Sequence, residues 1–215
     1  MAKRDDGRSR GSSKRNGNGL SRREFIKGTS AAVSAGVLVT EDLLKAQAPA
    51  AKVFGPGAVP LKLRVNGQAR NVSVEPRVTL LDALRDQLDL TGAKKVCDRA
   101  TCGACTVIVD GKAVYSCTML AIEAQGREVL TIEGLAPDNQ LHPVSAAFVE
   151  NDAQQCGFCT PGFVMACKAY LDANANPSYE QVKLALNGNI CRCGTYVGVR
   201  KAVLDAATKM KGGRA

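Results

Sequence analysis

The sequence has no tryptophan, only one histidine and few aromatic residues, which make up 4% of its 215 positions. So few large side chains limit the hydrophobic core that the chain can build, although 45% of its residues are hydrophobic and rigid prosthetic groups would add stability. The single histidine, His142, excludes a Rieske-type centre, which needs two histidine ligands. The sequence also offers no credible Ser/His/Asp or paired-carboxylate arrangement for catalysis.

Nucleotide-binding signatures are missing as well. No GxGxxG follows a strand pattern and no Walker motif occurs, so the chain should bind neither NAD, FAD nor ATP by those modes. The net charge is +9, but residues 1–27 carry nine Lys and Arg against three Asp and Glu and therefore hold +6 of it. Nucleic-acid binding is poorly supported, because the basic excess is a tail rather than a stripe on a folded face.

The first fifty residues predict an export signal. Residues 1–20 are polar and basic and should be disordered. Residues 21–27, SRREFIK, resemble the twin-arginine signal, and the apolar run of about thirteen residues that follows is too short to span a bilayer. An A-x-A pattern at 48–50 predicts cleavage after Ala50. We expect a periplasmic protein that is exported already folded; a basic arm on a cytosolic protein is the alternative.

Four of the nine cysteines lie close together in the middle of the chain. Their spacing is C-x4-C-x2-C, then eleven residues, then a fourth cysteine, which is the plant-type [2Fe–2S] ligand spacing. The predicted ligands of a first cluster are Cys97, Cys102, Cys105 and Cys117.

Small and basic residues surround this first set of cysteines. Gly103 lets the backbone approach the sulfurs, so that its N–H groups can hydrogen-bond to them. Lys94, Lys95 and Arg99 either offset the negative charge of a cluster or form an ordinary solvated face.

A second set of four cysteines lies in the segments QCGFCTPGF and GNICRCG. Eight of the nine cysteines thus form two groups of four, the ligand count of two [2Fe–2S] clusters. The predicted ligands of the second cluster are Cys156, Cys159, Cys191 and Cys193. The remaining cysteine, Cys167, is expected to be a small core residue on a helix. A zinc site, or a disulfide framework with an interaction role, is the alternative for these cysteines.

Hydrophobic patterning predicts an α+β fold with two domains. In residues 59–136, alternating segments flank Asn66-Gly67 and Asp110-Gly111, which are typical hairpin turns. A helix should begin after the N-cap Thr79 and end at Gly92, and a last strand should cover 128–132. Two hairpins around one helix resemble the β-grasp of plant-type ferredoxins.

The second domain, residues 137–210, has helical patterning. Its expected helices cover residues 143–151, 161–173, 178–186 and 197–209. Ser178 and Gln181 form a capping box, and Pro161 suits the first turn of its helix. A small four-helix bundle would place the second set of cysteines at one end, where two helix N-termini direct partial positive charge toward thiolates.

QCGFCTPGF and GNICRCG, after a plant-type cluster domain, resemble the iron–sulfur subunit of the molybdenum hydroxylases, the xanthine dehydrogenase and aldehyde oxidase family. The resemblance covers about residues 59–210. Together with the export signal, the chain most resembles the small subunit of periplasmic aldehyde oxidoreductases. The isoquinoline oxidoreductase subunit is also similar.

The resemblance implies that two [2Fe–2S] clusters relay electrons from a molybdopterin, of the cytosine dinucleotide type, on a large partner subunit. An FAD-binding subunit or a cytochrome-type partner would accept them, and the complex would be a heterotrimer of the aldehyde oxidoreductase class. Gln155 and Cys193 would lie near the pterin. The hydroxylation chemistry would belong to the partner, so no catalytic residue is expected in this chain.

One departure from the family pattern leaves the acceptor open. The family commonly has CRCTGY, whereas residues 191–196 read CRCGTY, as in a bacterial subgroup whose acceptors vary. The substrate also stays open between an aldehyde and a nitrogen heterocycle. A free-standing electron carrier with two clusters is the remaining alternative.

Overall fold

The computed structural model describes residues 23, 25–27, 53–137 and 140–212. The chain divides into two units, Met1–Lys52 and Val53–Ala215. The described residues of the first unit are helical and exposed. The expected disorder of residues 1–20, the apolar signal run and the cleavage site lie outside the described residues. No helix in the described part of the chain is long and apolar enough to cross a membrane.

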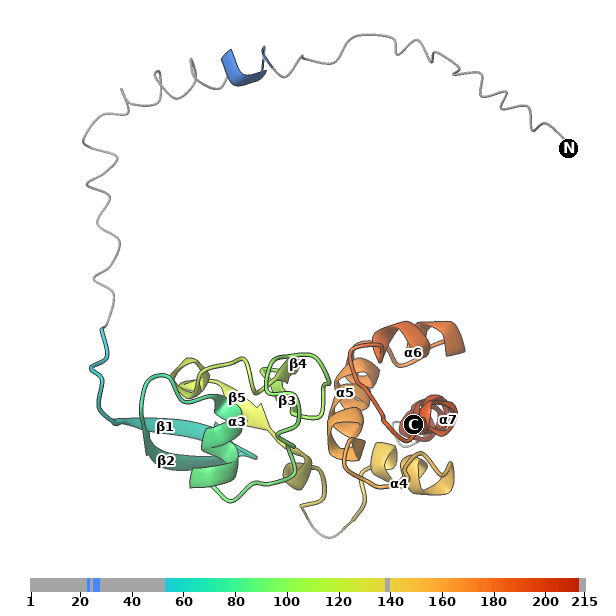
Figure 1. Ribbon diagram of the computed structural model, residues 1–215. Coiled ribbons are helices and arrows are strands. Elements are labelled where there is room, and N and C mark those ends of the chain that lie inside the picture. Colours follow the sequence, from blue (N-terminus) through green and yellow to red (C-terminus); the bar gives the residue numbers. More distant parts are fainter. Residues whose placement is uncertain (1–22, 24, 28–52, 138–139, 213–215) are drawn as a thin grey trace, which may run out of the picture. The chain divides into compact units, whose positions relative to one another are not determined.

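The second unit begins with a five-stranded mixed sheet (Figure 1). Its strand order is β2-β1-β5-β3-β4; β1 and β5 are parallel and the other neighbours are antiparallel. The strands are β1 Val59–Val65, β2 Gln68–Val74, β3 Thr106–Val109, β4 Lys112–Tyr115 and β5 Glu128–Leu130.

Two tight turns set the register of the hairpins. Asn66 and Gly67 join β1 to β2 with φ values of 51° and 74°, and Asp110 and Gly111 join β3 to β4 with 48° and 78°. Positive φ at both turn residues matches the right-handed twist of the flanking strands, which is why Asn-Gly and Asp-Gly are favoured there. Both predicted hairpins are confirmed.

The helix of this half is shorter than predicted. Thr79 caps it by accepting a hydrogen bond from the Asp82 amide at 3.1 Å, and α3 Leu80–Asp82 runs into the π-helical turn η1 Ala83–Gln87. The expected end at Gly92 is wrong, because Asp89 has a φ of 58° and leaves the helix before that point.

The last predicted strand is also shorter. It ends at Leu130, and the chain then forms the 3₁₀ helix η3 Ile132–Leu135; another 3₁₀ helix, η2 Ala121–Ala124, precedes β5. The strand turns away because the amide of Thr131 donates to the side-chain oxygen of Asn66 at 2.9 Å instead of to a neighbouring strand.

All four predicted helices of the second half are present. They are α4 Pro143–Glu150, α5 Thr160–Ala173, α6 Tyr179–Ala185 and α7 Tyr196–Gly212. Ser178 and Gln181 form the expected capping box at the start of α6, and Pro161 lies in the first turn of α5. Figure 1 shows α5 next to the sheet, with the other helices on its far side.

Strand β3 joins the two hydrophobic cores. Because successive side chains of a strand point to opposite faces, Val107 and Val109 enter the core beneath α3, whereas Ile108 enters the core of the helices. All four residues of β3 are buried. The sheet and the helices are therefore packed as one body through β3 and α5.

Candidate metal centres

The first set of cysteines, Cys97, Cys102, Cys105 and Cys117, comes from two segments. The first three lie on the loop between η1 and β3, and Cys117 follows β4. The thiols meet in two pairs, in which Cys97 contacts Cys102 and Cys105 contacts Cys117. The structure thus brings all four predicted residues together, in pairs.

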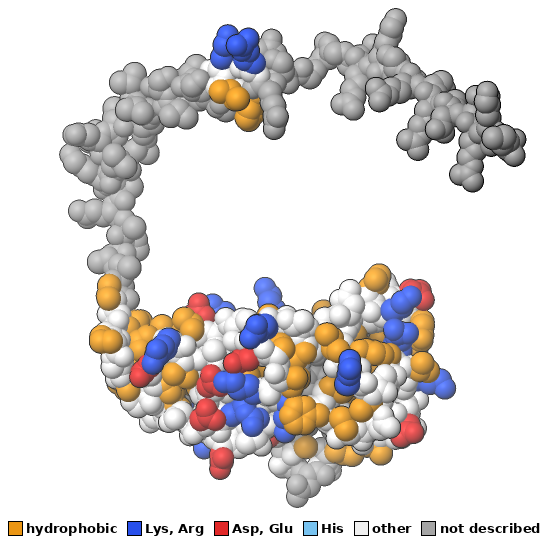
Figure 2. Space-filling model, in the orientation of Figure 1, with side chains coloured by type: hydrophobic (Ala, Val, Ile, Leu, Met, Phe, Trp, Pro, Cys, Tyr) orange, Lys and Arg blue, Asp and Glu red, His pale blue; other side chains and the backbone are white. Residues whose placement is uncertain are grey.

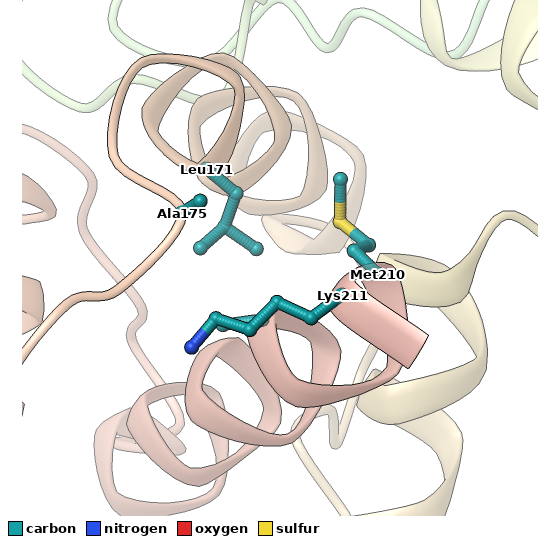
Figure 3. A pocket seen from close by; sticks show the side chains of 5 residues that line it. Leu171, Ala175, Met210 and Lys211 are labelled. Atoms are coloured by element: carbon teal, nitrogen blue, oxygen red, sulfur yellow. The ribbon is translucent and has the colours of Figure 1, made fainter. Parts of the chain in front are cut away.

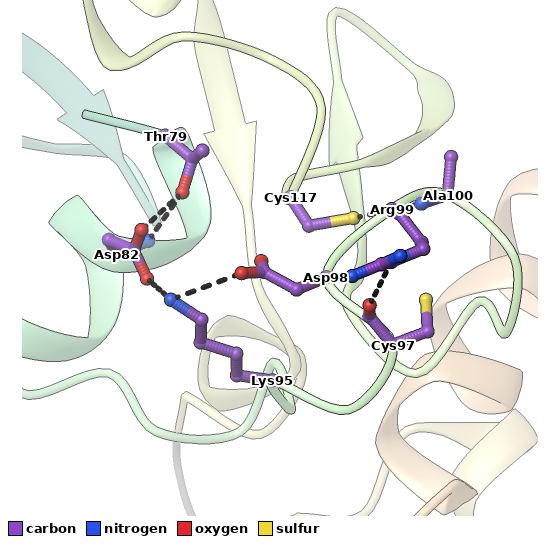
Figure 4. Close-up of polar contacts among 8 residues, drawn as sticks. All are labelled: Thr79, Asp82, Lys95, Cys97, Asp98, Arg99, Ala100 and Cys117. Atoms are coloured by element: carbon purple, nitrogen blue, oxygen red, sulfur yellow. Dashed lines mark hydrogen bonds and ion pairs between the residues drawn. The ribbon is translucent and has the colours of Figure 1, made fainter. Parts of the chain in front are cut away.

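Backbone N–H groups of this loop point at the sulfurs. The amide of Thr101 donates to the sulfur of Cys97 at 3.3 Å. The amide of Ala100 donates to the sulfur of Cys117 at 3.4 Å (Figure 4). A backbone hydrogen bond with Arg99 is the main reason why the pKa of Cys97 is lowered to about 6. Burial instead raises the pKa of Cys105 to about 12. Donors of this kind stabilise thiolates and tune the potentials of iron–sulfur sites.

Two of the basic residues near the first set make local contacts. The amino group of Lys95 forms ion pairs with Asp82 at 2.8 Å and Asp98 at 3.4 Å, and its pKa is raised chiefly by the hydrogen bond to Asp82 (Figure 4). Arg99 donates to the carbonyl of Cys97 at 3.2 Å. Both therefore hold the shape of the cysteine loop.

Lys94 connects the first cysteine loop to the second. Its ammonium donates to the Thr91 carbonyl at 2.8 Å and lies 6.0 Å from the ring centroid of Phe158, the residue before Cys159. A cation at this distance from an aromatic face is weakly attracted to it.

The second set, Cys156, Cys159, Cys191 and Cys193, lies where α5 and α7 begin. Cys159 is the residue before α5, and Cys193 lies three residues ahead of α7. The thiols again form two pairs: Cys156 with Cys193 and Cys159 with Cys191.

Hydrogen bonds fix Cys191 in particular. Its amide donates to the Tyr196 hydroxyl at 2.9 Å, and its sulfur lies 3.2 Å from the Thr195 hydroxyl. Burial acts to raise the pKa of Cys191, but hydrogen bonds with Thr195 outweigh it and lower the pKa to about 7. Its neighbour Cys159 has its pKa raised to about 12 by burial.

The other pair of the second set is similarly unequal. A backbone hydrogen bond with Phe158 lowers the pKa of Cys156. A backbone hydrogen bond with Cys156 acts to lower the pKa of Cys193, but side-chain contact with the same residue and burial raise it. Neighbouring thiolates repel each other, so both members of a pair ionise together only when positive charge such as iron balances them.

The paired arrangement fits binuclear iron–sulfur centres. Each [2Fe–2S] cluster is held by four cysteines, two on each iron. A structural zinc site instead needs four ligands around one ion. Among the described residues, no three Cys, His, Asp or Glu side chains converge as ligands of a single metal ion. All nine cysteines are in the described part of the chain and are free thiols, so a disulfide framework is not present.

The two sets adjoin each other at the junction of the two halves. The amide of Ile190 donates to the carbonyl of Cys102 at 2.9 Å. A Cβ added to Gly162, in the first turns of α5, would lie 2.9 Å from the Cα of Ala104 and would collide with the carbonyl oxygen of Gly103. Glycine at 162 is therefore what allows α5 to approach the first cysteine loop so closely.

Sequence patterns gave no sign of this junction. The residues that form it from the second half, Gly188, Asn189 and Ile190, lie more than 70 positions after their partners in the first half. They belong to the GNIC segment, but their spacing carries no signal of a contact with the first loop.

The remaining predicted residues are placed clearly. Gln155, Cys156 and Cys193 are exposed at the surface. Cys167 is completely buried in α5, and burial raises the pKa of its thiol. Cys167 is thus the core residue that was expected, confirmed by its burial.

The surface cleft beside α5 and α7 is too small for a substrate, and the charges on one face of the molecule form no single stripe (Figure 2). The cleft between the ends of α5 and α7, lined by Leu171, Ala175, Met210 and Lys211, has a volume of only ≈ 10 Å³ (Figure 3). That volume holds about one water molecule. On the face in Figure 2, basic side chains of residues 53–212 lie among acidic ones rather than in a single stripe.

Comparison with known proteins agrees with this arrangement. Residues 63–131 match the family described as 2Fe-2S iron-sulfur cluster binding domain, and residues 131–204 match the [2Fe-2S] binding domain family. The aldehyde oxidoreductase iron-sulfur-binding subunit PaoA of Escherichia coli O157:H7 is 41% identical over 207 residues, which cover 89% of this chain and 90% of that protein.

Two further relatives have other substrates in their names. The nicotine 6-hydroxylase small subunit of Paenarthrobacter nicotinovorans is 47% identical over 148 residues, 69% of this chain and 89% of that protein. The crystal structure of quinoline 2-oxidoreductase from Pseudomonas putida 86 superposes with a TM-score of 0.70 and 36% identity, over 74% of this chain and 99% of that chain. The chain therefore belongs to the iron–sulfur subunits of the molybdenum hydroxylase family, and its function is electron transfer within an oxidoreductase.

Proposed function

We propose that this chain binds two [2Fe–2S] clusters and passes single electrons between them. Cys97 and Cys102 hold one iron of the first cluster, and Cys105 and Cys117 hold the other. In the second cluster the iron-binding pairs are Cys156 with Cys193 and Cys159 with Cys191. The observation that carries this proposal is the meeting of all eight thiols in four pairs. When bound, each cluster accepts and releases one electron at a time.

The electrons come from a molybdopterin on a large partner subunit that oxidises an aldehyde. Support comes from the aldehyde oxidoreductase relative and from the surface around the second set of cysteines. Phe158, Ile190 and Val197 are 51%, 46% and 64% exposed and all lie within four residues of a cysteine of that set. Exposed apolar side chains near a redox site favour a permanent partner over a free-standing carrier.

Gln155 and Cys193 face the pterin in this proposal, since both are exposed beside that apolar surface. Electrons leave from the first cluster to an FAD-binding subunit or a cytochrome-type acceptor, which completes a heterotrimer. The large subunit's own residues perform the hydroxylation.

Metal analysis of the purified complex tests the cluster assignment. We expect about four irons and about four acid-labile sulfides per copy of this chain, and two distinct paramagnetic signals after reduction with dithionite. Zinc in place of iron, or a single paramagnetic centre, would overturn the proposal.

A nitrogen-heterocycle hydroxylase is the second candidate, favoured by the nicotine and quinoline enzymes among the relatives. The same complex decides between them when it is assayed with an aromatic aldehyde and with quinoline under identical conditions. Faster turnover of the aldehyde supports the first candidate, and faster turnover of quinoline supports the second.

Export folded, by the twin-arginine route to the periplasm, is part of the proposal. It is supported by the sequence of residues 21–27. Replacing Arg22 and Arg23 by lysine should retain the chain and its partners in the cytoplasm, whereas the same change at Arg4 and Arg8 should not. Equal periplasmic yield of both variants would contradict it.

A further inference from the structure

Asn189 is one of the few polar side chains buried in the described part of the chain, with 6% of its surface exposed. It lies two residues before Cys191, in the loop between α6 and α7. Its side-chain amide, however, points into the first half of the molecule, where it donates to the carbonyl of Gly103 at 2.9 Å and lies 3.4 Å from the hydroxyl of Thr106. A residue of the second cysteine segment thus contacts the first cysteine loop directly.

The carbonyl of Gly103 is the point where several donors meet. Besides Asn189, it accepts hydrogen bonds from the Thr106 amide at 3.1 Å and from the Thr106 hydroxyl at 2.6 Å. Gly103 lies between Cys102 and Cys105 and has a φ of +69°. Because a Cβ at Gly103 would lie 2.6 Å from the Asn189 amide nitrogen, this side chain covers the turn as well as bonding to it.

The neighbours of Asn189 make the contact rigid. The hydroxyl of Tyr115, at the end of β4, donates to the carbonyl of Gly188 at 2.8 Å, and the amide of Ile190 donates to Cys102. Three consecutive residues of the loop are therefore hydrogen-bonded to the first half. Asn189 supplies the only one of these three contacts that uses a side chain of the loop, so a substitution in the loop can remove it without changing the loop backbone.

We propose that Asn189 is a positioning residue for the first cluster, although it belongs to the segment that holds the second. Its amide locks the turn between Cys102 and Cys105 and draws electron density from the peptide group that links them. Hydrogen bonds and dipoles around the ligands are among the properties by which a protein sets iron–sulfur potentials. The first cluster should therefore be easier to reduce with Asn189 in place. This inference rests on the cluster assignment proposed above.

A potentiometric titration of the complex, followed by paramagnetic resonance, tests this role. Asn189→Leu removes the donor and keeps the branching of the side chain, and Asn189→Asp places a negative charge against the Gly103 carbonyl. We expect the midpoint potential of the first cluster to fall in both variants, more in Asn189→Asp, and to fall by more than that of the second cluster. A Cys97→Ser variant identifies which signal belongs to the first cluster.

Asn187 provides the matched control, because it is exposed and lies two residues away on the same loop. Asn187→Asp introduces the same charge and Asn187→Leu the same side chain without touching Gly103. Shifts of the first-cluster potential that are equal in the 187 and 189 variants would overturn the inference. The proposed function itself fails only if the wild-type complex lacks two clusters. Failure of this inference, with both clusters present, is therefore distinguishable from failure of the proposed function.

A second variant covers the case in which both Asn189 variants fail to assemble. Thr106→Val keeps the shape of a buried side chain but removes the 2.6 Å hydrogen bond to the same Gly103 carbonyl. It should lower the first-cluster potential in the same direction. An unchanged potential in Thr106→Val would show that donors to this carbonyl do not tune the cluster.

Discussion

The amide of Ile190 and the carbonyl of Cys102 are 2.9 Å apart and hydrogen-bonded, across 88 positions of sequence. Ile190 directly precedes Cys191, so a single hydrogen bond links a cysteine of the first set to a cysteine of the second through backbone atoms alone. The connection does not depend on the identity of the Ile190 side chain, which is 46% exposed.

Removing this N–H should weaken the link between the two sites. Ile190→Pro lacks the donor, whereas Ile190→Ala keeps it and changes only the exposed side chain. We expect the proline variant to lose about 1 kcal/mol of stability and to transfer electrons between clusters more slowly. Stopped-flow reduction by substrate, monitored at both clusters, measures the rate. Equal rates in the proline and alanine variants would contradict the prediction.

The ninth cysteine separates ligand loss from general destabilisation. Cys105→Ala should abolish the first paramagnetic signal and leave the second. Cys167→Ala, buried in α5 without another cysteine in contact, should keep both clusters at a cost of about 1 kcal/mol. Iron content and resonance spectra of the two variants provide the comparison. Loss of a cluster from Cys167→Ala would show that the ligand assignment is wrong.

Gly162 should tolerate no side chain. Alanine has the higher helix propensity by about 1 kcal/mol, but its Cβ would press on the backbone of Gly103 and Ala104, which cannot rotate away. We expect Gly162→Ala to lose about 1–3 kcal/mol, with a fall in Tm of about 2–4 °C per kcal/mol. Gly55→Ala is the control, since a Cβ there meets no atom within 4 Å. A Tm for Gly162→Ala equal to that of the control would refute the close approach.

His142 should make stability depend on pH. Its ring nitrogen Nδ1 accepts a hydrogen bond from the Val144 amide at 3.2 Å at the start of α4. Burial, and to a lesser extent the positive charge of Lys168, lower its pKa below the ordinary value of 6.5. The negative charge of Asp172 acts in the opposite direction. The folded state thus favours neutral His142.

A lowered folded pKa means that this stabilisation is complete above about pH 6.5 and is lost as the pH falls through the folded pKa. The Tm of the wild type should therefore drop more steeply between about pH 7 and about pH 5 than that of His142→Asn, whose side chain caps the helix without titrating. Parallel Tm curves for the two proteins would exclude the effect.

Local patterns were sufficient to predict both hairpins, the four helices of the second half and the two sets of cysteines. The Asn66-Gly67 and Asp110-Gly111 turns require positive φ, and the Ser178 capping box requires only neighbours in sequence, so each is readable from a few residues. The ligand spacing of the first set is local for the same reason. The predicted ligands themselves stay a prediction until metal analysis.

Long-range contacts could not be predicted in this way. No sequence feature near Gly92 shows that the helix ends before Asp89. After that point the chain is held by the Arg85 side chain, which donates to the carbonyls of Thr91 and Ala93 at 2.8 Å each. Likewise, the position of Asn189 against Gly103 depends on how the two halves pack. Such contacts follow from tertiary structure rather than from spacing.

Strand β3 has a consequence for how the protein can be divided. A fragment that ended near residue 136 would leave the Ile108 side chain exposed to water. A fragment that began there would lack Ile108, which is part of the hydrophobic core of the helices. We therefore expect residues 63–131 and 131–204 to unfold in a single cooperative transition. Limited proteolysis should release neither region as an intact folded fragment.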